Sequence, residues 1–211
     1  METCIREKPI LFSSAMIRAI LAGQKTQTRR VMCCQSGPYK GKLPLDVLPM
    51  NVPNEWIGLM ERDPNHGQMF KCRFGIPGDR LWVRETWCYK YDPKTEHIIE
   101  PYEAWYRASG PDVMKVGDDG LCEGSPWKPS IHMPRNLSRI TLEITNVRVQ
   151  RLQEITEEDA QAEGAEYFGD IDYTTGETYG VVYRRGCDSI NGKKYPWESN
   201  PWVWVIEFKR L

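Results

Sequence analysis

Lys25, Thr28, Arg29 and Arg30 lie within six residues of one another, directly after a short apolar stretch that ends at Gly23. Glycine commonly closes a helix, and a helix end needs at most one basic residue in its last turn. The other cations and the hydroxyl therefore exceed what a helix C-terminus requires. We predict that this turn forms the floor of a site for an anionic or nucleotide-like ligand.

Lys25 and Thr28 are residue types that could act together as a base and a nucleophile. The threonine hydroxyl is a weak nucleophile unless a nearby base removes its proton. Lys25 could be that base if burial, or the charges of Arg29 and Arg30, lower its pKa. A Lys25 that keeps its proton could instead stabilise an oxyanion. The structural alternative is a lysine that favours the helix dipole and a threonine that bonds the backbone.

Two segments of opposite charge are expected to position this turn. Residues 8–45 contain seven Lys or Arg and no acid, and the helix predicted there has Ser13 or Ser14 as its N-cap. Residues 152–182 contain nine Asp or Glu and no base, and a second helix is predicted there between Thr156 and a glycine. Such segments attract each other or line opposite walls of a cleft. The alternative is two separate solvated faces.

Three stretches have strong strand patterns. Residues 138–152 alternate apolar and polar side chains, and the phase shifts near Asn146, which predicts a bulge. The apolar run at 200–208 predicts a central strand that is buried on both faces. Residues 80–87 form a third predicted strand, in which Glu85 shares a face with aliphatic side chains. An acid in that position indicates that this end of the strand opens into a polar site.

Many strands and only two convincing helices predict an α+β fold, a small β-barrel with helices packed against it. The chain, 1–211, is expected to be a single domain. Two stretches rich in Pro and Gly, at about 33–75 and 89–130, are expected to be long loop insertions. Within the first of them, residues 56–60 and 69–72 predict a hairpin.

The composition limits the possible functions. The 211 residues carry a net charge of −1, so the global basic signature of many nucleic-acid binders is missing. The seven cysteines lack the Cys/His spacing of a metal site, so we expect neither a metal nor a cofactor. An odd set of scattered thiols suits a reducing cytoplasm. No apolar run reaches 18 residues, so we expect a cytoplasmic protein without a membrane partner.

Further polar and aromatic side chains could bind a substrate. Trp82, Arg84 and Glu85 come from the predicted strand at 80–87, and His132 and Arg135 from an irregular basic segment. An exposed tryptophan beside arginines can stack a base and hold a phosphate. The alternatives are that Arg84 pairs with Glu85 and that His132 is an ordinary loop residue.

Three segments together resemble the ASCH domain superfamily, whose fold is a PUA-like β-barrel. The signature of that family is a helix that ends in a G-x-K-x-x-E-x-R turn, which this chain matches at Gly23, Lys25 and Arg30. The chain has Thr28 at the acidic position. The other similar segments are a Gly-Asp turn with its strand, 78–83, an acidic helix, 157–164, and a closing strand, 203–209.

Thr28 makes the chain similar to one branch, the small bacterial N4-acetylcytidine amidohydrolases, which also carry K-T-x-T-x-R. That resemblance implies a catalytic set of Lys25, Thr28 and Glu163. Glu163 would accept a proton, orient Lys25 or donate a proton to the leaving amine. The resemblance covers about half of the chain, since the two insertions have no counterpart in those short enzymes. The chain also looks like a longer, often phage-encoded ASCH group.

The resemblance therefore predicts a hydrolase that removes an acyl group from N4-acylated cytidine or a related modified nucleoside. Arg29 and Arg30 would join the other candidate residues in binding a nucleoside or single-stranded RNA. Two alternatives stay open, a non-catalytic module that binds RNA or a modified base, and a ribonuclease that needs no metal.

Overall fold

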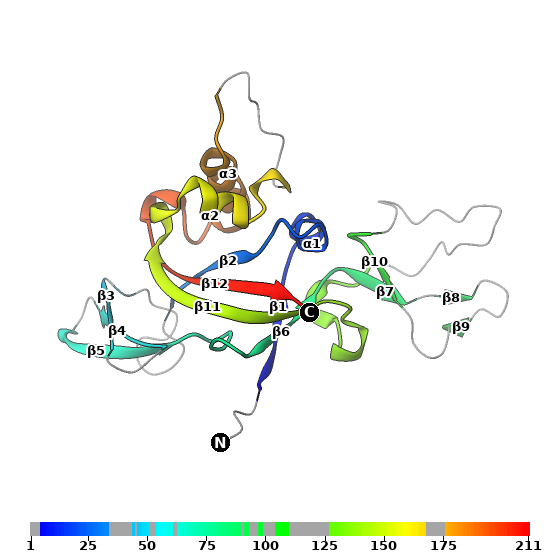
Figure 1. Cartoon of the computed structure of the whole chain (residues 1–211), viewed down its shortest axis with the longest axis horizontal. Helices are drawn as coiled ribbons and strands as arrows, with labels where there is room; N and C mark the ends of the chain where they lie inside the picture. The colour runs from blue at the N-terminus through cyan, green and yellow to red at the C-terminus, as the bar shows by residue number, and fades with distance from the viewer. Residues whose placement is uncertain are drawn as a thin grey trace.

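Strands dominate the described part of the chain, and helices α2 (Glu157–Ala162) and α3 (Tyr179–Asn191) lie side by side while α1 (Ser14–Leu21) stands apart from them (Figure 1). A computed structural model describes residues 5–33, 44, 46–50, 54–60, 63–89, 91–92, 97–98, 104–109, 127–167 and 176–211. The predicted α+β class is confirmed. No helix in these ranges has the length and apolar character needed to cross a membrane.

The largest sheet has five strands in the order β1-β6-β11-β12-β2. Among its described strands β1 and β6 are parallel, and the other neighbours are antiparallel. In the described part of the chain this sheet is open, with β1 and β2 at its edges, rather than the closed barrel that was expected. The strands are β1 (Glu7–Leu11), β2 (Gln27–Val31), β6 (Arg80–Arg84), β11 (Thr141–Arg151) and β12 (Trp202–Arg210).

The two long strands follow their sequence patterns. The pairing of β11 with β12 shifts register between Ile144 and Asn146, which confirms the predicted bulge, and Val147 returns to the core. The prediction of a two-sided central strand is also confirmed for β12. Trp204 packs into the core that β12 shares with helix α1, while Val205 packs into a second core under helices α2 and α3. Successive side chains of one strand thus supply two separate cores.

Two helices were predicted and lie where expected. Helix α1 (Ser14–Leu21) is capped by Ser13 and is followed by Gly23 at φ 76°. Helix α2 (Glu157–Ala162) is capped by Thr156, whose side chain accepts a hydrogen bond from the Asp159 amide. In both helices the N-cap is a hydroxyl residue, Ser13 or Thr156, that closely precedes the apolar or acidic residues of the helix.

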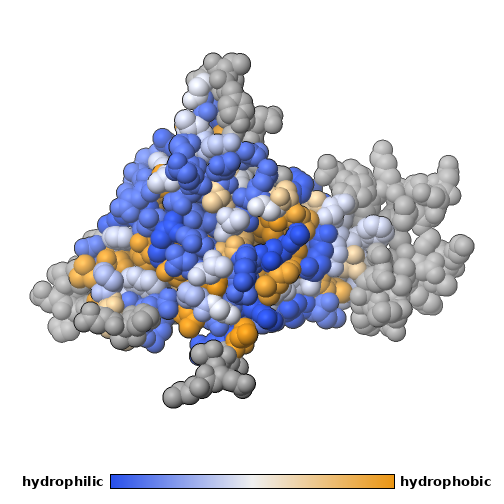
Figure 2. Space-filling view, viewed as in Figure 1, coloured by the Kyte–Doolittle hydropathy of each residue, from blue (hydrophilic) through white to orange (hydrophobic). Residues whose placement is uncertain are grey.

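A third helix, α3 (Tyr179–Asn191), was missed, so the expectation of two helices is wrong. Its buried side chains Val182 and Tyr183 lie on the face that packs against α2 and the sheet. The surface around α2 and α3 is largely hydrophilic in Figure 2. The short 3₁₀ helices are Ser130–His132, Arg135–Leu137, Leu152–Glu154, Ala165–Tyr167 and Trp197–Ser199.

The first expected insertion contains a small sheet and is more than a loop. Strands β3 (Asp46–Pro49), β4 (Glu55–Met60) and β5 (Asp63–Lys71) are antiparallel neighbours, which confirms the predicted hairpin pairing, although β5 begins at Asp63 and not at the predicted position 69. Trp56 packs edge-on against Trp204 of the main sheet, with ring centroids 4.9 Å apart. The insertion therefore shares the main core. Its residues 34–43 lie outside the described ranges.

The second expected insertion is described in part. Strand β7 (Trp87–Tyr89) pairs with β10 (Ala104–Tyr106), and β8 (Tyr91–Asp92) pairs with β9 (His97–Ile98). Residues 90, 93–96, 99–103 and 110–126 of this insertion lie outside the described ranges.

Gly164 generates the first testable prediction. It has φ +76°, and an added Cβ would lie 2.9 Å from Ala19 Cβ and 3.3 Å from Lys25 Cβ. Gly176 has φ +73° with nothing within 4 Å, so it is a matched control for backbone strain alone. We expect Gly164→Ala to reduce the free energy of unfolding by about 1–3 kcal/mol more than Gly176→Ala, because it adds overpacking to the left-handed backbone penalty. Urea denaturation of both variants checks this, and equal losses would contradict close packing at Gly164.

Candidate functional site

Lys25 and Glu163, which are 138 positions apart in sequence, form a buried ion pair. Lys25 Nζ donates to Glu163 Oε2 at 2.6 Å, to the Glu163 carbonyl at 2.8 Å and to the Gln27 carbonyl at 2.7 Å. The two side chains are 0% and 3% exposed. An ammonium group has three donors, and all three are satisfied here. The structure thus brings together the predicted basic turn and the predicted acidic helix.

The meeting of two helix ends positions this pair. The backbone amides of Gln24 and Lys25 donate back to the Ala19 carbonyl of α1, and the Thr26 amide donates to the Ala162 carbonyl of α2. Glu163 is the C-cap residue of α2. The ammonium therefore lies where helix carbonyls carry partial negative charge, which favours a cation.

Burial changes the acid–base behaviour of Lys25. Desolvation lowers the pKa of its ammonium below the ordinary value, and the charges of Arg30 and Arg29 lower it further. The charge and hydrogen bond of Glu163 act in the opposite direction and raise this pKa. The net effect is a lower Lys25 pKa, which is the direction that Lys25 needs in order to act as a base.

Thr28 and Arg30 share one face of β2, because side chains alternate along a strand. Phe12 lies near this face: its ring centroid is 5.6 Å from Lys25 Nζ and 5.2 Å from the Arg30 guanidinium carbon. Arg30 also donates to the Leu11 carbonyl at 2.7 Å. Thr28, which is 2% exposed, is therefore buried on the face of β2 that carries Arg30, and Lys25 precedes this strand.

Arg29 points to the opposite face of β2, toward α2. Its Nη2 donates to Asp159 Oδ2 at 2.7 Å, and its Nη1 lies 3.8 Å from Glu163 Oε1. The side chain is 1% exposed. Burial raises the pKa of the Asp159 carboxyl, but the hydrogen bonds and charges of Arg29 and Arg148 outweigh it, so that pKa is lowered overall. Arg29, predicted to bind substrate, is thus placed among protein charges.

Sequence reasoning missed two polar groups near Glu163. Tyr183 and Cys187 come from α3, and burial, with the Glu163 charge, raises the pKa of the tyrosine well above its ordinary value and that of the thiol to about 11. Both groups therefore stay neutral at physiological pH. The spacing of Val182, Tyr183 and Cys187 on one side of a helix is the signal that could have revealed them.

The other candidate residues gather around Trp82. The guanidinium carbons of Arg84 and Arg135 lie 4.7 Å and 6.0 Å from the centroid of the Trp82 ring. Trp82 itself is only 9% exposed. Glu85 is paired with Arg139 by two hydrogen bonds of 2.8 and 2.9 Å, and the supposed Arg84–Glu85 pair is wrong.

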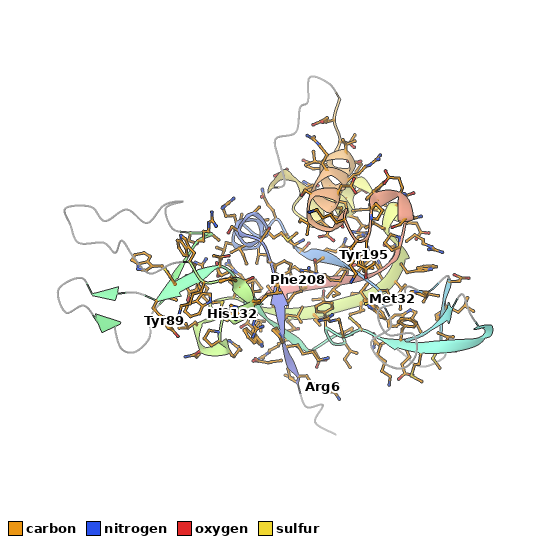
Figure 3. All side chains as sticks on the ribbon, turned by 180° about the vertical axis from the view of Figure 1, so that it is seen from behind. Arg6, Met32, Tyr89, His132, Tyr195 and Phe208 are labelled. Atoms are coloured by element: carbon orange, nitrogen blue, oxygen red, sulfur yellow. The ribbon has the colours of Figure 1, made fainter. Side chains whose placement is uncertain are left out.

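This second cluster adjoins the first through Phe12, whose amide donates to the Arg84 carbonyl at 3.3 Å. His132 is exposed and lies on the Tyr89 side of the molecule, away from the α2–α3 helices (Figure 3). No group of three or more His, Cys, Asp or Glu side chains within the described ranges is placed to hold a metal ion.

The buried pair generates the second testable prediction. Lys25→Met or Glu163→Gln alone leaves an uncompensated buried charge, and we expect each to cost about 3–5 kcal/mol of unfolding free energy. The double variant should lose clearly less unfolding free energy than the two single variants added together, because it leaves no unpaired buried charge. The exposed Arg184–Glu198 pair, at 2.7 Å, is the control, and its double-mutant cycle should show almost no coupling. Additive losses at Lys25 and Glu163 would contradict the buried pair.

The chain was also compared with known proteins. No protein-family model matches it, and no curated protein matches it. It is similar to the crystal structure of protein EF3133 from Enterococcus faecalis V583, described by the family-model DUF984. The two share 9% sequence identity, the match covers 100% of this chain and 83% of that chain, and the TM-score is 0.40. A likeness of this degree carries no conclusion about function.

Proposed function

We propose that this protein is a PUA-like, ASCH-type hydrolase that removes the acyl group from N4-acylated cytidine or a related modified nucleoside. Lys25, Thr28 and Glu163 are its catalytic set. The single observation that carries the proposal is the 2.6 Å contact between buried Lys25 and Glu163, beside a strand in which Thr28 faces the same side as Arg30. An amide hydrolase needs a base, a nucleophile and a proton donor, and these three residue types supply them.

The Lys25–Glu163 pair offers a route to an uncharged lysine. A proton that passes from Lys25 Nζ to Glu163 Oε2 leaves an amine and a carboxylic acid, and burial favours this neutral form of the pair. The amine then takes the proton of the Thr28 hydroxyl while Oγ1 bonds to the acyl carbon. Charge develops on the acyl oxygen at this point and needs a donor.

Arg30 can supply that donor. Its Nε is buried and has no hydrogen-bond partner in the described part of the chain. As the bond from the acyl carbon to N4 breaks, Glu163 gives its proton to the leaving amine, and the acyl group stays on Thr28. Glu163 then takes a proton from water, which attacks the ester, and the Lys25 ammonium returns a proton to Thr28 Oγ1. The ionised pair is restored when the proton passes back to Lys25.

A depression beside the helix ends favours an uncharged substrate. It measures about 220 Å³, and its lining residues are chain neighbours of the buried Lys25 and Glu163: Gln24, Glu158, Gln161, Ala162, Gly164 and Glu166. Two of its lining residues are Glu158 and Glu166, and none of them is a cation. Carboxylates repel a phosphodiester strand but not a neutral nucleoside. Trp82, the expected stacking surface for RNA, is largely covered by arginines.

The assay incubates purified protein with N4-acetylcytidine and separates cytidine by chromatography, which gives the third prediction. Lys25→Met, Thr28→Val and Glu163→Gln should each lower kcat/KM by about 10²-fold or more, since each removes a group from the proton path. Thr28→Ser keeps the hydroxyl and should retain activity. Arg184→Met, on the exposed face of α3, is the control and should match the wild type.

Two results would contradict the hydrolase proposal. One is a wild-type protein that releases no cytidine yet binds oligonucleotides with a steep salt dependence, which would indicate a binding module. The other is cleavage of single-stranded RNA in chelator with no effect on N4-acetylcytidine, which would indicate a ribonuclease.

A further inference from the structure

Six charged side chains continue outward from the candidate site in a row of alternating sign. Lys25 contacts Glu163, Glu163 faces Arg29, and Arg29 contacts Asp159. Asp159 in turn accepts from Arg148 at 2.9 Å, and Arg148 pairs with a glutamate of β12. Exposure rises along this row, from 0% at Lys25 to 18% at Asp159 and to 36% at the last carboxylate. In order, the members are Lys25, Glu163, Arg29, Asp159, Arg148 and Glu207.

The link between Arg29 and Glu163 is the incomplete one in this row. Arg29 Nη1 and Nε are buried without a hydrogen-bond partner among the described residues, and so is Glu163 Oε1. The closest approach of the two groups is 3.8 Å, from Nη1 to Oε1. At this distance two buried opposite charges still attract each other strongly, although no direct hydrogen bond forms. One carboxylate oxygen of Glu163 is therefore held by Lys25 while the other faces Arg29.

We propose that Arg29 is a positioning residue for the candidate reaction: anchored by Asp159, it holds the Glu163 carboxylate so that Oε2 stays on Lys25. This inference rests on the proposed function for its kinetic consequences only. The geometric part concerns the charge balance of a buried pair and holds whatever the substrate is. Arg29 was expected to touch the substrate, and the new role explains why it is instead turned toward α2 and sealed from solvent.

A guanidinium suits this place better than an ammonium. Its planar fork can direct Nη2 to Asp159 and Nη1 to Glu163 at the same time, whereas a lysine would offer one point charge. The unmatched Nε and Nη1 donors would be costly to bury for packing alone. Their burial is explained if the Arg29 guanidinium holds the Glu163 carboxylate in place.

The charges around the pair set the sign of the expected pH effect. Among the described residues, the ionisable groups near Lys25 and Glu163 are Arg29 and Arg30 from β2 and Tyr183 and Cys187 from α3, and Arg29 is itself paired with Asp159 from α2. Tyr183 and Cys187 are neutral near pH 7. Removing the positive charge of Arg29 favours the charged form of Lys25, so the Lys25 pKa should rise.

Arg29→Met and Arg29→Lys test the proposal with two readouts, and Arg184→Met is the matched control. In the first readout, ¹⁵N NMR follows the Lys25 Nζ resonance as a function of pH. Arg29→Met should move its titration to higher pH, because one nearby positive charge is removed, and Arg29→Lys should return it toward the wild-type position. In the second, kcat for N4-acetylcytidine should fall about 10²-fold in Arg29→Met with KM nearly unchanged, because substrate contacts are intact.

The part of the kcat–pH profile that reports deprotonation of Lys25 should move to higher pH together with the NMR titration.

If Arg29→Met does not fold, Asp159→Asn is the second variant, since it keeps Arg29 but removes the carboxylate charge that anchors it. It should lower kcat in the same direction. An Arg29→Met protein whose Lys25 titration is unchanged would overturn the inference. So would an Arg29→Lys protein in which kcat falls as much as in Arg29→Met while the pH profile of kcat does not move. A wild-type protein without hydrolase activity would refute the proposed function, while the NMR titration would still decide the role of Arg29.

Discussion

The buried contact between Lys25 and Glu163 is the interaction on which the surrounding structure depends. Taking two charges out of water is costly, and their attraction repays that cost only with good geometry and further hydrogen bonds. Here the ammonium has three acceptors, two of them backbone carbonyls at the ends of helices or strands. The ends of α1 and α2 must therefore meet, and glycine at position 164 allows the close approach.

Strand β12 explains how one sheet can hold two kinds of polar group next to each other. Its alternate side chains fill separate cores, one against α1 and one against α2 and α3. The neighbouring strand β2 pairs with β12 residue by residue, so its alternate side chains point toward the same two cores. Thr28 and Arg30 lie on the α1 face, and Arg29 lies on the α2 face. One face can thus present a reactive group while the other supports it.

Much of the fold could be predicted because its signals are local. The caps Ser13 and Thr156, the bulge near Asn146 and the two-sided strand β12 each arise from a few adjacent residues. Helix α3 was missed because Gly and Thr residues precede it and its polar face interrupts the apolar pattern. The closed barrel was inferred from the many strands and few helices as well as from a resemblance, and only pairing across the sheet could test it.

The candidate site could be predicted only in part. The family resemblance named Lys25 and Glu163 together as candidates, and the structure places them in contact. The partners of Arg29 and Glu85 could not be predicted, because Asp159 and Arg139 are 130 and 54 positions away from them along the chain. The Arg29–Asp159 contact depends on how α2 packs on the sheet, and the Arg139–Glu85 contact depends on how the segment before β11 lies beside β6, so both are properties of the whole fold.

The most direct measurement is peptide mass spectrometry of protein quenched in acid during turnover of N4-acetylcytidine. If Lys25 activates Thr28 as a nucleophile, an acetyl group should appear on the peptide that contains Thr28. The modification should be absent from Thr28→Val, and Thr28→Ser should carry it at the same position. Cytidine release without any acetylated protein, or with the acetyl group on Lys25 in place of Thr28, would contradict this catalytic role.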